Sequence, residues 1–282
     1  MKISSIFKGD ALEILPKLPP ASYQSIIADP PYFNVLREDW DQQWKNADDY
    51  LKWTSQWVSL CMRALKDDGL MFCFGQLGKR EHVFIHAMAE LCRAFRFHDL
   101  IIWDRAVGYD RRDSFSPAYE MILALCKSRQ PRFVKDAVRE PYDSATIESY
   151  ARDKRYKNKA ARMEYLMKGK FSTNILRVPS LKGTSREKVG HPAQKPIALM
   201  EKLILCSTQP GDSVLDPFLG SGTTAVAAEM HNRFWTGIEI SESYVKIAEE
   251  RLAAHRTTLP RGVDARGGAG PLRPRRGVAR AR

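Results

Sequence analysis

Four consecutive residues, Asp29-Pro30-Pro31-Tyr32, combine the side chains and the rigidity of a small catalytic clamp. They follow an apolar run, Ser25-Ile26-Ile27-Ala28, which predicts a short buried strand. A carboxylate, two prolines with a fixed backbone and an aromatic ring at the carboxyl end of a strand suit a planar ring that bears an amino group. The alternative is a proline turn that only ends the strand.

A second motif, near the other end of the chain, predicts a site for a nucleoside-like ligand. Residues 212–224 indicate a strand, a glycine turn and a helix start, and Gly220 and Gly222 let a ligand approach the backbone closely. Glu239, 23 residues after Asp216, stands at the end of the next strand and can accept hydrogen bonds from ribose hydroxyls. The third glycine of a dinucleotide fingerprint is absent, and the acidic Asp216 favours a ligand with an ammonium group over one with phosphates. The alternative role for Glu239 is to cap the following helix.

The elements that must position these motifs indicate an α/β fold. Between residues 50 and 65 the apolar spacing is helical, and we expect its tryptophans to belong to the core. Residues 131–190 break the alternation with charged, poorly periodic sequence and are the candidate recognition region. Seven apolar runs of strand length alternate with helical stretches: Ile3–Phe7, Ser25–Asp29, Leu70–Phe74, Leu100–Trp103, Met121–Cys126, Ser213–Asp216 and Trp235–Ile240.

Composition places limits on the class of protein. With 282 residues, of which 44% are hydrophobic, the chain can form one main domain. It contains no apolar run long enough to span a bilayer and its start lacks a signal-peptide core, so we expect a cytoplasmic protein without a membrane partner. The five cysteines are scattered and never spaced C-x-x-C, which predicts neither a disulfide framework nor a metal site.

The net charge of +12 is concentrated in two segments. Residues 256–282 hold eight arginines and one acid, and this tail is expected to be disordered, either gripping phosphates or lying solvated. Residues 152–170 hold eight basic side chains and two acidic ones, with tyrosines interleaved. This second pattern suits the binding of a phosphate backbone, and its alternative is a solvated helix face.

Together, the two motifs resemble those of the amino-group DNA methyltransferases that use S-adenosylmethionine. Asp29-Pro30-Pro31-Tyr32 resembles the D-P-P-Y catalytic motif of that family, and Asp216-Pro217-Phe218-Leu219-Gly220-Ser221-Gly222 resembles its D-x-F-x-G-x-G cofactor motif. The catalytic motif precedes the cofactor motif with the charged insertion between them, as in the circularly permuted β class. The resemblance implies a Rossmann-like methyltransferase fold with a seven-stranded, mostly parallel sheet and helices on both faces. Its catalytic domain would be residues 1–255, with residues 131–190 inserted for target recognition.

Further segments extend the resemblance. Gly9-Asp10 is similar to a segment that contacts the cofactor adenine, and residues 191–196 (His-Pro-Ala-Gln-Lys-Pro) resemble the H-P-x-Q-K-P motif beside the methionine end. Residues 137–143 resemble RsrI-type members, which modify an adenine within GAATTC, but recognition segments diverge fastest and the target is not carried over. The resemblance implies that S-adenosylmethionine is bound by Asp10, Ala11, Asp29, Lys195, Asp216, Phe218, Gly220, Ser221, Gly222, Thr223, Glu239 and Ile240. Asp10 has an alternative role as a helix N-cap, and Lys195 has one in a structural ion pair.

The chemistry implied is methyl transfer to an amino group whose lone pair is delocalised into a ring. The Asp29 carboxylate and the Pro30 carbonyl would accept the two amino hydrogens and localise that lone pair, and Pro31 would keep the clamp rigid. Tyr32 would stack on a base that has left the duplex. No metal is required. The resemblance implies double-stranded DNA as the partner, contacted by residues 131–190 and by the loop 34–49. It also allows a cognate restriction endonuclease as a partner and the formation of a homodimer.

Three other functions compete with adenine-N6 methylation. Cytosine-N4 methylation uses the same fold, although cytosine members of the family more often have Ser in the place of Asp29. A catalytically inactive relative that only binds nucleic acid would not need the acid and both glycines, and this chain has all three. Methylation of RNA or of a protein glutamine is usually carried out by relatives whose motif begins with Asn.

Overall fold

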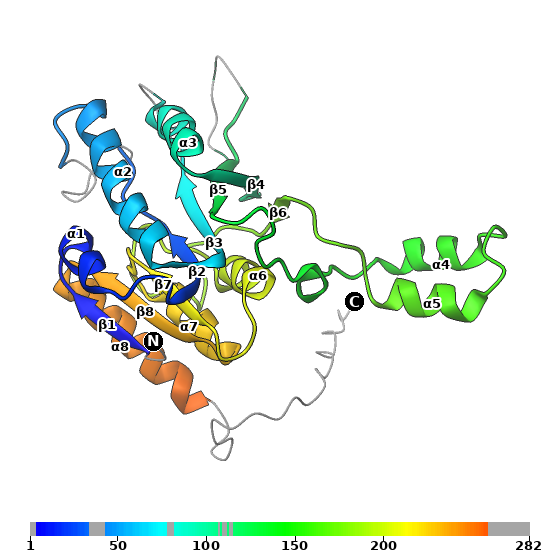
Figure 1. The fold of residues 1–282 in the computed structure, drawn as a ribbon. Helices are drawn as coiled ribbons and strands as arrows, with labels where there is room; N and C mark the ends of the chain where they lie inside the picture. Colours follow the sequence, from blue (N-terminus) through cyan, green and yellow to red (C-terminus); the bar gives the residue numbers. More distant parts are fainter. Residues whose placement is uncertain are drawn as a thin grey trace.

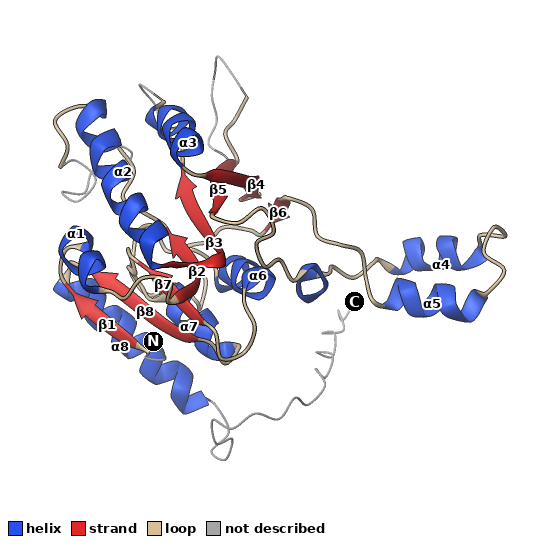
Figure 2. Ribbon diagram, viewed as in Figure 1, coloured by secondary structure: helices blue, strands red, loops and turns tan. Residues whose placement is uncertain are grey.

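The computed structural model describes residues 4–33, 43–77, 82–106, 108, 112 and 115–258. Its strands are β1 (Ser5–Lys8), β2 (Tyr23–Ala28), β3 (Leu65–Gly75), β4 (Arg96–Asp104), β5 (Tyr119–Cys126), β6 (Ile175–Arg177), β7 (Ser213–Asp216) and β8 (Phe234–Glu239). They form one sheet in the order β1-β8-β7-β2-β3-β5-β4-β6 (Figures 1 and 2). Strand β5 is antiparallel to both of its neighbours, and every other neighbouring pair is parallel.

Helices cover both faces of this sheet. The side chains of a strand alternate between its two faces, so Ile26 and Met71 lie in one buried cluster while Ile27 and Phe72 lie in the other. The first cluster packs against α1 (Ala11–Ile14), α2 (Ala47–Ala64) and α3 (Val83–Ala94). The second packs against α6 (Ile197–Ser207), α7 (Thr223–Met230) and α8 (Glu242–Thr258). The predicted three-layer α/β fold is therefore confirmed.

The predicted strand count was wrong by one. All seven predicted runs form strands, and the eighth strand, β6, lies inside the charged insertion and pairs with β4. It has three residues, of which Leu176 alone is buried, so it is too short and too polar to show an alternating pattern.

Helix α2 holds the tryptophans that the sequence assigned to the core. Asn46 caps the helix, because its side chain accepts a hydrogen bond from the Asp49 backbone N–H at 2.9 Å. Trp57 is fully buried, and the rings of Trp53 and Trp57 lie 5.5 and 5.0 Å from the ring of Phe218. The helix thereby supports the turn in which Phe218 lies.

The insertion forms an arm that projects from the body of the molecule (Figure 1). It consists of α4 (Ser144–Arg152) and α5 (Lys159–Met167), and the guanidinium of Arg162 lies 4.1 Å from the ring centre of Tyr156. A short 3-10 turn, η3 (Lys135–Val138), and an antiparallel bridge between Glu140 and Lys170 form its base. The arm is anchored there to α6, since Lys202 donates to the Glu140 carboxylate at 2.9 Å.

Two predicted segments lie partly outside the residues that the structure describes. The boundary after residue 255 falls inside α8, which ends at Thr258, and residues 259–282 of the predicted basic tail lie outside the described residues. Residues 34–42 of the predicted DNA-contacting loop do so as well. Among the described ranges, no helix combines the length and the apolarity needed to cross a bilayer.

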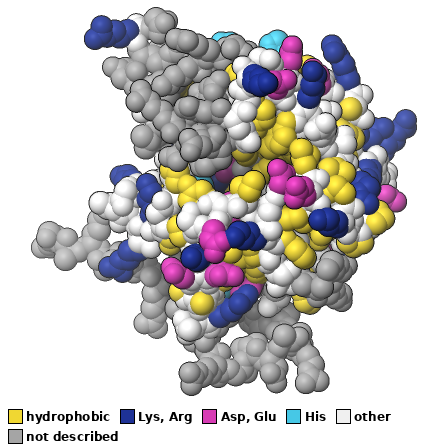
Figure 3. Space-filling view, turned by 90° about the vertical axis from the view of Figure 1, so that its left-hand side faces the viewer, with side chains coloured by type: hydrophobic (Ala, Val, Ile, Leu, Met, Phe, Trp, Pro, Cys, Tyr) yellow, Lys and Arg dark blue, Asp and Glu magenta, His cyan; other side chains and the backbone are white. Residues whose placement is uncertain are grey.

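The basic residues are unevenly placed. On the face shown in Figure 3, acidic and basic side chains are interspersed with hydrophobic ones. On the arm, by contrast, Arg152, Lys154, Arg155, Lys157 and Lys159 are all exposed. The charge excess that the sequence located in residues 152–170 is therefore presented to solvent.

We expect Trp57→Ala to lower the free energy of unfolding by about 3–5 kcal/mol, because it removes a fully buried ring and leaves a cavity under Phe218. Denaturant unfolding followed by circular dichroism measures this loss. Trp57→Phe is the matched control and should lose less, since it keeps an aromatic contact. A loss below about 1 kcal/mol for Trp57→Ala would show that α2 does not anchor this part of the sheet.

Candidate active site

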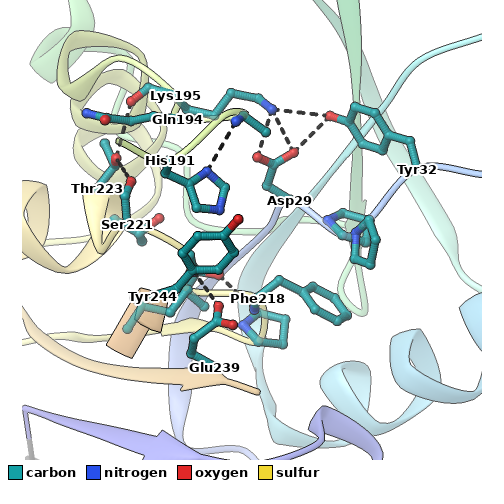
Figure 4. A pocket seen from close by; sticks show the side chains of 18 of the residues that line it. Asp29, Tyr32, His191, Gln194, Lys195, Phe218, Ser221, Thr223, Glu239 and Tyr244 are labelled. Atoms are coloured by element: carbon teal, nitrogen blue, oxygen red, sulfur yellow. Dashed lines mark hydrogen bonds and ion pairs between the residues drawn. The ribbon is translucent and has the colours of Figure 1, made fainter. Parts of the chain in front are cut away.

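The carboxyl ends of the parallel strands meet at one edge of the sheet, and the polar side chains of both motifs meet there. Asp29 follows β2, Asp216 ends β7 and Glu239 ends β8. They border a single cavity of about 590 Å³ (Figure 4). Ligands of open α/β sheets bind outside the carboxyl ends of the strands, and this volume suits a ligand of cofactor size.

Lys195 lies at the centre of a cluster of buried polar groups. Its Nζ lies 2.9 and 2.7 Å from the two carboxylate oxygens of Asp29 and 3.4 Å from Glu120 Oε2. The Lys195 and Glu120 side chains are only 6% and 5% exposed, so the ammonium depends on the two carboxylates for stabilisation and the carboxylates depend on the ammonium. The predicted alternative role of Lys195, a structural ion pair, is therefore confirmed. We call Asp29, Tyr32, Glu120 and Lys195 the buried charge cluster.

The hydroxyl of Tyr32 connects the two carboxylates of this cluster. Its oxygen lies 2.8 Å from Asp29 Oδ1 and 3.0 Å from Glu120 Oε2. The ring is partly buried and packs against the hydrophobic core. Tyr32 also borders the cavity, and its stacking on a base stays a prediction.

The charges in the buried charge cluster shift one another's proton affinities. Burial raises the pKa of Asp29 above its ordinary value, although the Lys195 ammonium opposes this shift. Burial lowers the pKa of Lys195, but the charges of Asp29 and Glu120 outweigh it, so the pKa is raised overall. Burial and the two neighbouring carboxylates raise the pKa of Tyr32 well above its ordinary value. The ammonium and the phenol therefore keep their protons at neutral pH.

Two residues that no motif contains hold Glu120 in place. Gln76, just after β3, donates from its Nε2 to Glu120 Oε1 at 2.7 Å, and Arg105, just after β4, lies 3.4 Å from the same oxygen. Sequence reasoning missed all three side chains. The available signal was one acidic residue, Glu120, at the start of an otherwise apolar strand.

Glu239 fixes the glycine turn. Its Oε2 accepts from the Gly220 backbone N–H at 2.7 Å and its Oε1 accepts from the Ser241 N–H at 2.8 Å. Its own carbonyl accepts from Gly9 at 2.9 Å and so connects β8 to the segment that precedes α1. Glu239 therefore lies beside the turn, as the sequence predicted, and it also holds the residue that precedes α8. Its binding of ribose hydroxyls stays a prediction.

Asp216 and Asp10 have local roles as well as places in the cavity wall. Asp216 accepts from the Phe218 N–H at 3.0 Å, and burial raises its pKa to about 7. Asp10 accepts from the Leu12 N–H at 2.7 Å and caps α1, which confirms its alternative role as an N-cap. Both carboxylates border the cavity.

Gly222 is the predicted ligand-binding residue that does not border the cavity. It has a φ of +76°, and a Cβ at this position would lie 3.0 Å from the Cβ of Ala248. Glycine is therefore required here for the turn and for close packing against α8 rather than for contact with a ligand. Arg251 of α8 supports the same turn, because it donates to Thr223 Oγ1 at 2.7 Å and pairs with Glu187.

The structure brings the other predicted residues together in the cavity wall. They are Asp10, Ala11, Asp29, Pro30, Pro31, Tyr32, Lys195, Asp216, Phe218, Gly220, Ser221, Thr223, Glu239 and Ile240. His191 also borders the cavity, 4.3 Å from the ring of Tyr244, a residue that sequence reasoning missed. Burial and the charge of Lys195 lower the pKa of His191 to about 4, so its ring is neutral at physiological pH. No group of three or more potential metal ligands gathers within the described residues, and a reaction without a metal stays a prediction.

The fold and the site define an α/β enzyme with a carboxylate clamp facing a glycine turn. Residues 23–250 match the N6_N4_Mtase family, described as DNA methylase, and the chain therefore belongs to that family of DNA methyltransferases. The DNA adenine methyltransferase YhdJ of Escherichia coli (strain K12) is 32% identical over 256 residues, covering 88% of this chain and 82% of that protein. The Type II methyltransferase M.BglII of Bacillus subtilis is 30% identical over 263 residues, covering 89% and 69%.

Solved structures share this fold. The PvuII DNA methyltransferase, which is cytosine-N4-specific, superimposes with a TM-score of 0.67 at 19% identity, covering 93% of this chain and 90% of that one. The SAM complex of M1.HpyAVI superimposes with a TM-score of 0.58 at 26% identity, covering 89% and 99%. The second structure contains the cofactor that the sequence predicted for this chain.

We expect Lys195→Met to destabilise the protein by about 3–5 kcal/mol at pH 8, because it leaves the Asp29 carboxylate without its cation and Glu120 with Arg105 alone. Without the Lys195 ammonium, which opposes the effect of burial, the folded-state pKa of Asp29 rises further above its unfolded value. Protonation of Asp29 then stabilises the fold at low pH, and this stabilisation disappears as the pH rises.

The destabilisation by Lys195→Met should therefore be smaller at pH 5 than at pH 8, which thermal unfolding at both pH values can measure. Lys202→Met, which removes a more exposed ion pair with Glu140, is the control and should show little dependence on pH. Equal losses at both pH values would contradict the proposed charge balance.

Proposed function

We propose that this DNA methyltransferase transfers a methyl group from S-adenosylmethionine to N6 of adenine in double-stranded DNA. The observation that carries the proposal is the common cavity, in which the Asp29–Pro30 clamp faces the glycine turn held by Glu239. The family is named for N6 and N4 amino groups, and one relative is named a DNA adenine methyltransferase. The acid at position 29 also favours adenine over cytosine.

The donors and acceptors along the cavity fit S-adenosylmethionine. The Glu239 carboxylate, at the end of β8, would accept hydrogen bonds from ribose hydroxyls, and Asp216 would face the ammonium of the methionine end. Asp10, Ala11, Phe218 and Ile240 would line the adenine end, and Ser221 and Thr223 would lie beside the methionine end. The bound cofactor supplies a methyl group on a sulfonium.

The clamp has room for the amino group. Among the contacts of the described residues, Asp29 Oδ1 accepts from Tyr32 and Lys195, while Oδ2 accepts from Lys195 alone. One lone pair of Oδ2 is therefore left to accept an amino hydrogen, and the Pro30 carbonyl, which proline holds in a fixed direction, would accept the other. These two bonds would localise the nitrogen lone pair toward the methyl group, and each is worth roughly 1.5–3 kcal/mol where a charged group takes part.

The motif order supports a β-class enzyme, since β2 with the catalytic motif precedes β7 with the cofactor motif. We infer that residues 131–190 contact the DNA, because the arm exposes a row of basic side chains beside tyrosines. Several relatives, among them M.BglII and M.HpaI, are named Type II methyltransferases, which supports a place in a restriction–modification system with a companion endonuclease. A homodimer is proposed from the family resemblance alone.

Incubation of unmethylated DNA with isotope-labelled S-adenosylmethionine, followed by mass spectrometry of the nucleosides, should show label in N6-methyladenine. Label in N4-methylcytosine would show that the substrate base is cytosine rather than adenine. The absence of label from both nucleosides would contradict DNA methylation by this chain.

We expect Asp29→Ala to abolish methyl transfer while leaving cofactor affinity nearly unchanged, because its carboxylate serves the amino group. Asp216→Ala should instead weaken cofactor binding, by about tenfold if one charged hydrogen bond is lost. Calorimetric titration with S-adenosylmethionine and the methylation assay separate the two effects. Near-normal turnover by Asp29→Ala would refute the catalytic assignment.

We expect the triple variant Lys154→Ala, Arg155→Ala, Lys157→Ala to bind DNA more weakly and with a smaller salt dependence. Each lost phosphate contact should reduce the slope of log affinity against log salt by about 0.9. Fluorescence anisotropy with duplex DNA at several salt concentrations measures both quantities. The exposed Lys246, on α8, provides the matched control Lys246→Ala, and an unchanged slope in the triple variant would remove the arm from the DNA interface.

A further inference from the structure

The hydrogen bonds of the buried charge cluster lack one proton, and methyl transfer would supply one. The Tyr32 hydroxyl carries one hydrogen but lies within hydrogen-bond distance of two carboxylates, at 2.8 Å from Asp29 and 3.0 Å from Glu120. When both carboxylates are ionised, one of these two oxygen–oxygen contacts has no hydrogen from this hydroxyl. A single added proton would complete both hydrogen bonds.

Methyl transfer to an amino group releases one proton. The amino nitrogen forms a bond to the methyl carbon while the carbon–sulfur bond breaks and its electron pair remains on sulfur. The nitrogen then carries a positive charge until one of its hydrogens leaves as a proton. On the proposed function, the nearest acceptor is the Asp29 carboxylate.

We propose that Glu120 is the terminal acceptor of this proton and receives it from Asp29 through the Tyr32 hydroxyl. Asp29 takes the proton from nitrogen and passes it to the phenol oxygen, and the phenol gives its own hydrogen to Glu120 Oε2. Tyr32 ends as it began, Asp29 is again ionised, and Glu120 is neutral. In this relay Glu120 acts on the reacting nitrogen only through Tyr32 and Asp29, so it is a positioning residue.

The surroundings of Glu120 suit this role. Gln76 and Arg105 hold Oε1, which leaves Oε2 directed at Tyr32 and Lys195. Burial raises the pKa of Asp29, which helps this carboxylate to take the proton from the nitrogen in the first step. Glu120 also borders the cavity, so a proton held there can leave to solvent after the products have gone.

Several titratable groups lie beside this proton path, and their charges affect how the rate of methyl transfer depends on pH. Lys195 faces both carboxylates, Arg105 faces Glu120, and Asp216 and Cys73 lie close enough to Asp29 to interact electrostatically. Lys195 and Arg105 balance the charges of Asp29 and Glu120 before the reaction. The arriving proton leaves the buried charge cluster and Arg105 together with one net positive charge.

The test is the single-turnover rate of methyl transfer as a function of pH, with unmethylated plasmid DNA and labelled S-adenosylmethionine. Glu120→Gln keeps the size of the side chain, replaces one accepting oxygen by a donating amide group, and cannot accept a proton. We expect its rate to fall by about 100-fold, with cofactor affinity within about twofold of wild type and with a pH–rate profile that differs from that of the wild type. Glu120→Asp, a shorter carboxylate, should be intermediate.

A double-mutant cycle separates the relay from a structural role. If Glu120 acts through Tyr32, the double variant Tyr32→Phe, Glu120→Gln should be no slower than Tyr32→Phe alone, within about threefold. Glu201→Gln, which alters an ion pair with His231 outside the cavity, is the matched control and should keep the wild-type rate.

Two results would overturn the relay. One is a wild-type rate and pH profile for Glu120→Gln, and the other is additive losses in the double variant. If Glu120→Gln fails to fold, the rate and pH profile of Glu120→Asp decide, and a wild-type result there also overturns the proposal. A wild-type protein that methylates no DNA would overturn the proposed function and the relay together, and so differs from a failure of the relay alone.

Discussion

The structure of the site depends on the neutralisation of charges that have almost no contact with water. Each buried ion costs several kcal/mol unless it is paired, so Lys195, Asp29 and Glu120 must reach their positions together. They come from the loop before α6, from the end of β2 and from β5. The reversed strand β5 enters the sheet with its first residues at the edge where the parallel strands end, which is how Glu120 reaches Asp29. The charges of the site can therefore balance only when the strands of the sheet have assembled in the correct order.

Much of the fold and of the cavity wall could be predicted from the sequence because both follow from local patterns. Seven strands were visible as apolar runs, and the two motifs lie at strand ends, where parallel topology brings side chains together. Gly222 was assigned to the ligand because a G-x-G pattern does not reveal which glycine faces the cavity. Its close packing against Ala248, 26 residues along the chain, is a tertiary contact without a local signal.

The residues that could not be predicted act over long sequence distances. Glu120 lies 75 residues before Lys195, and neither Gln76 nor Arg105 stands in a recognisable motif. Their positions depend on strand order and register, which hydrophobic periodicity does not specify. Strand β6 was missed for a related reason, since a three-residue edge strand forms through pairing with β4 rather than through its own composition.

The pairing of the two ends of the chain has a consequence for biosynthesis. Strand β1 pairs with β8, so that Ser5 lies opposite Thr236, and β2 pairs with β7, so that Ser25 lies opposite Val214. A growing chain therefore leaves the ribosome with its catalytic strand unpaired on one edge until nearly the whole sequence has been translated. Contacts of such large sequence separation make folding slow, and the exposed edge favours aggregation. Activity consequently appears only when the last strand is complete, and a truncated product that lacks β8 cannot form the enzyme.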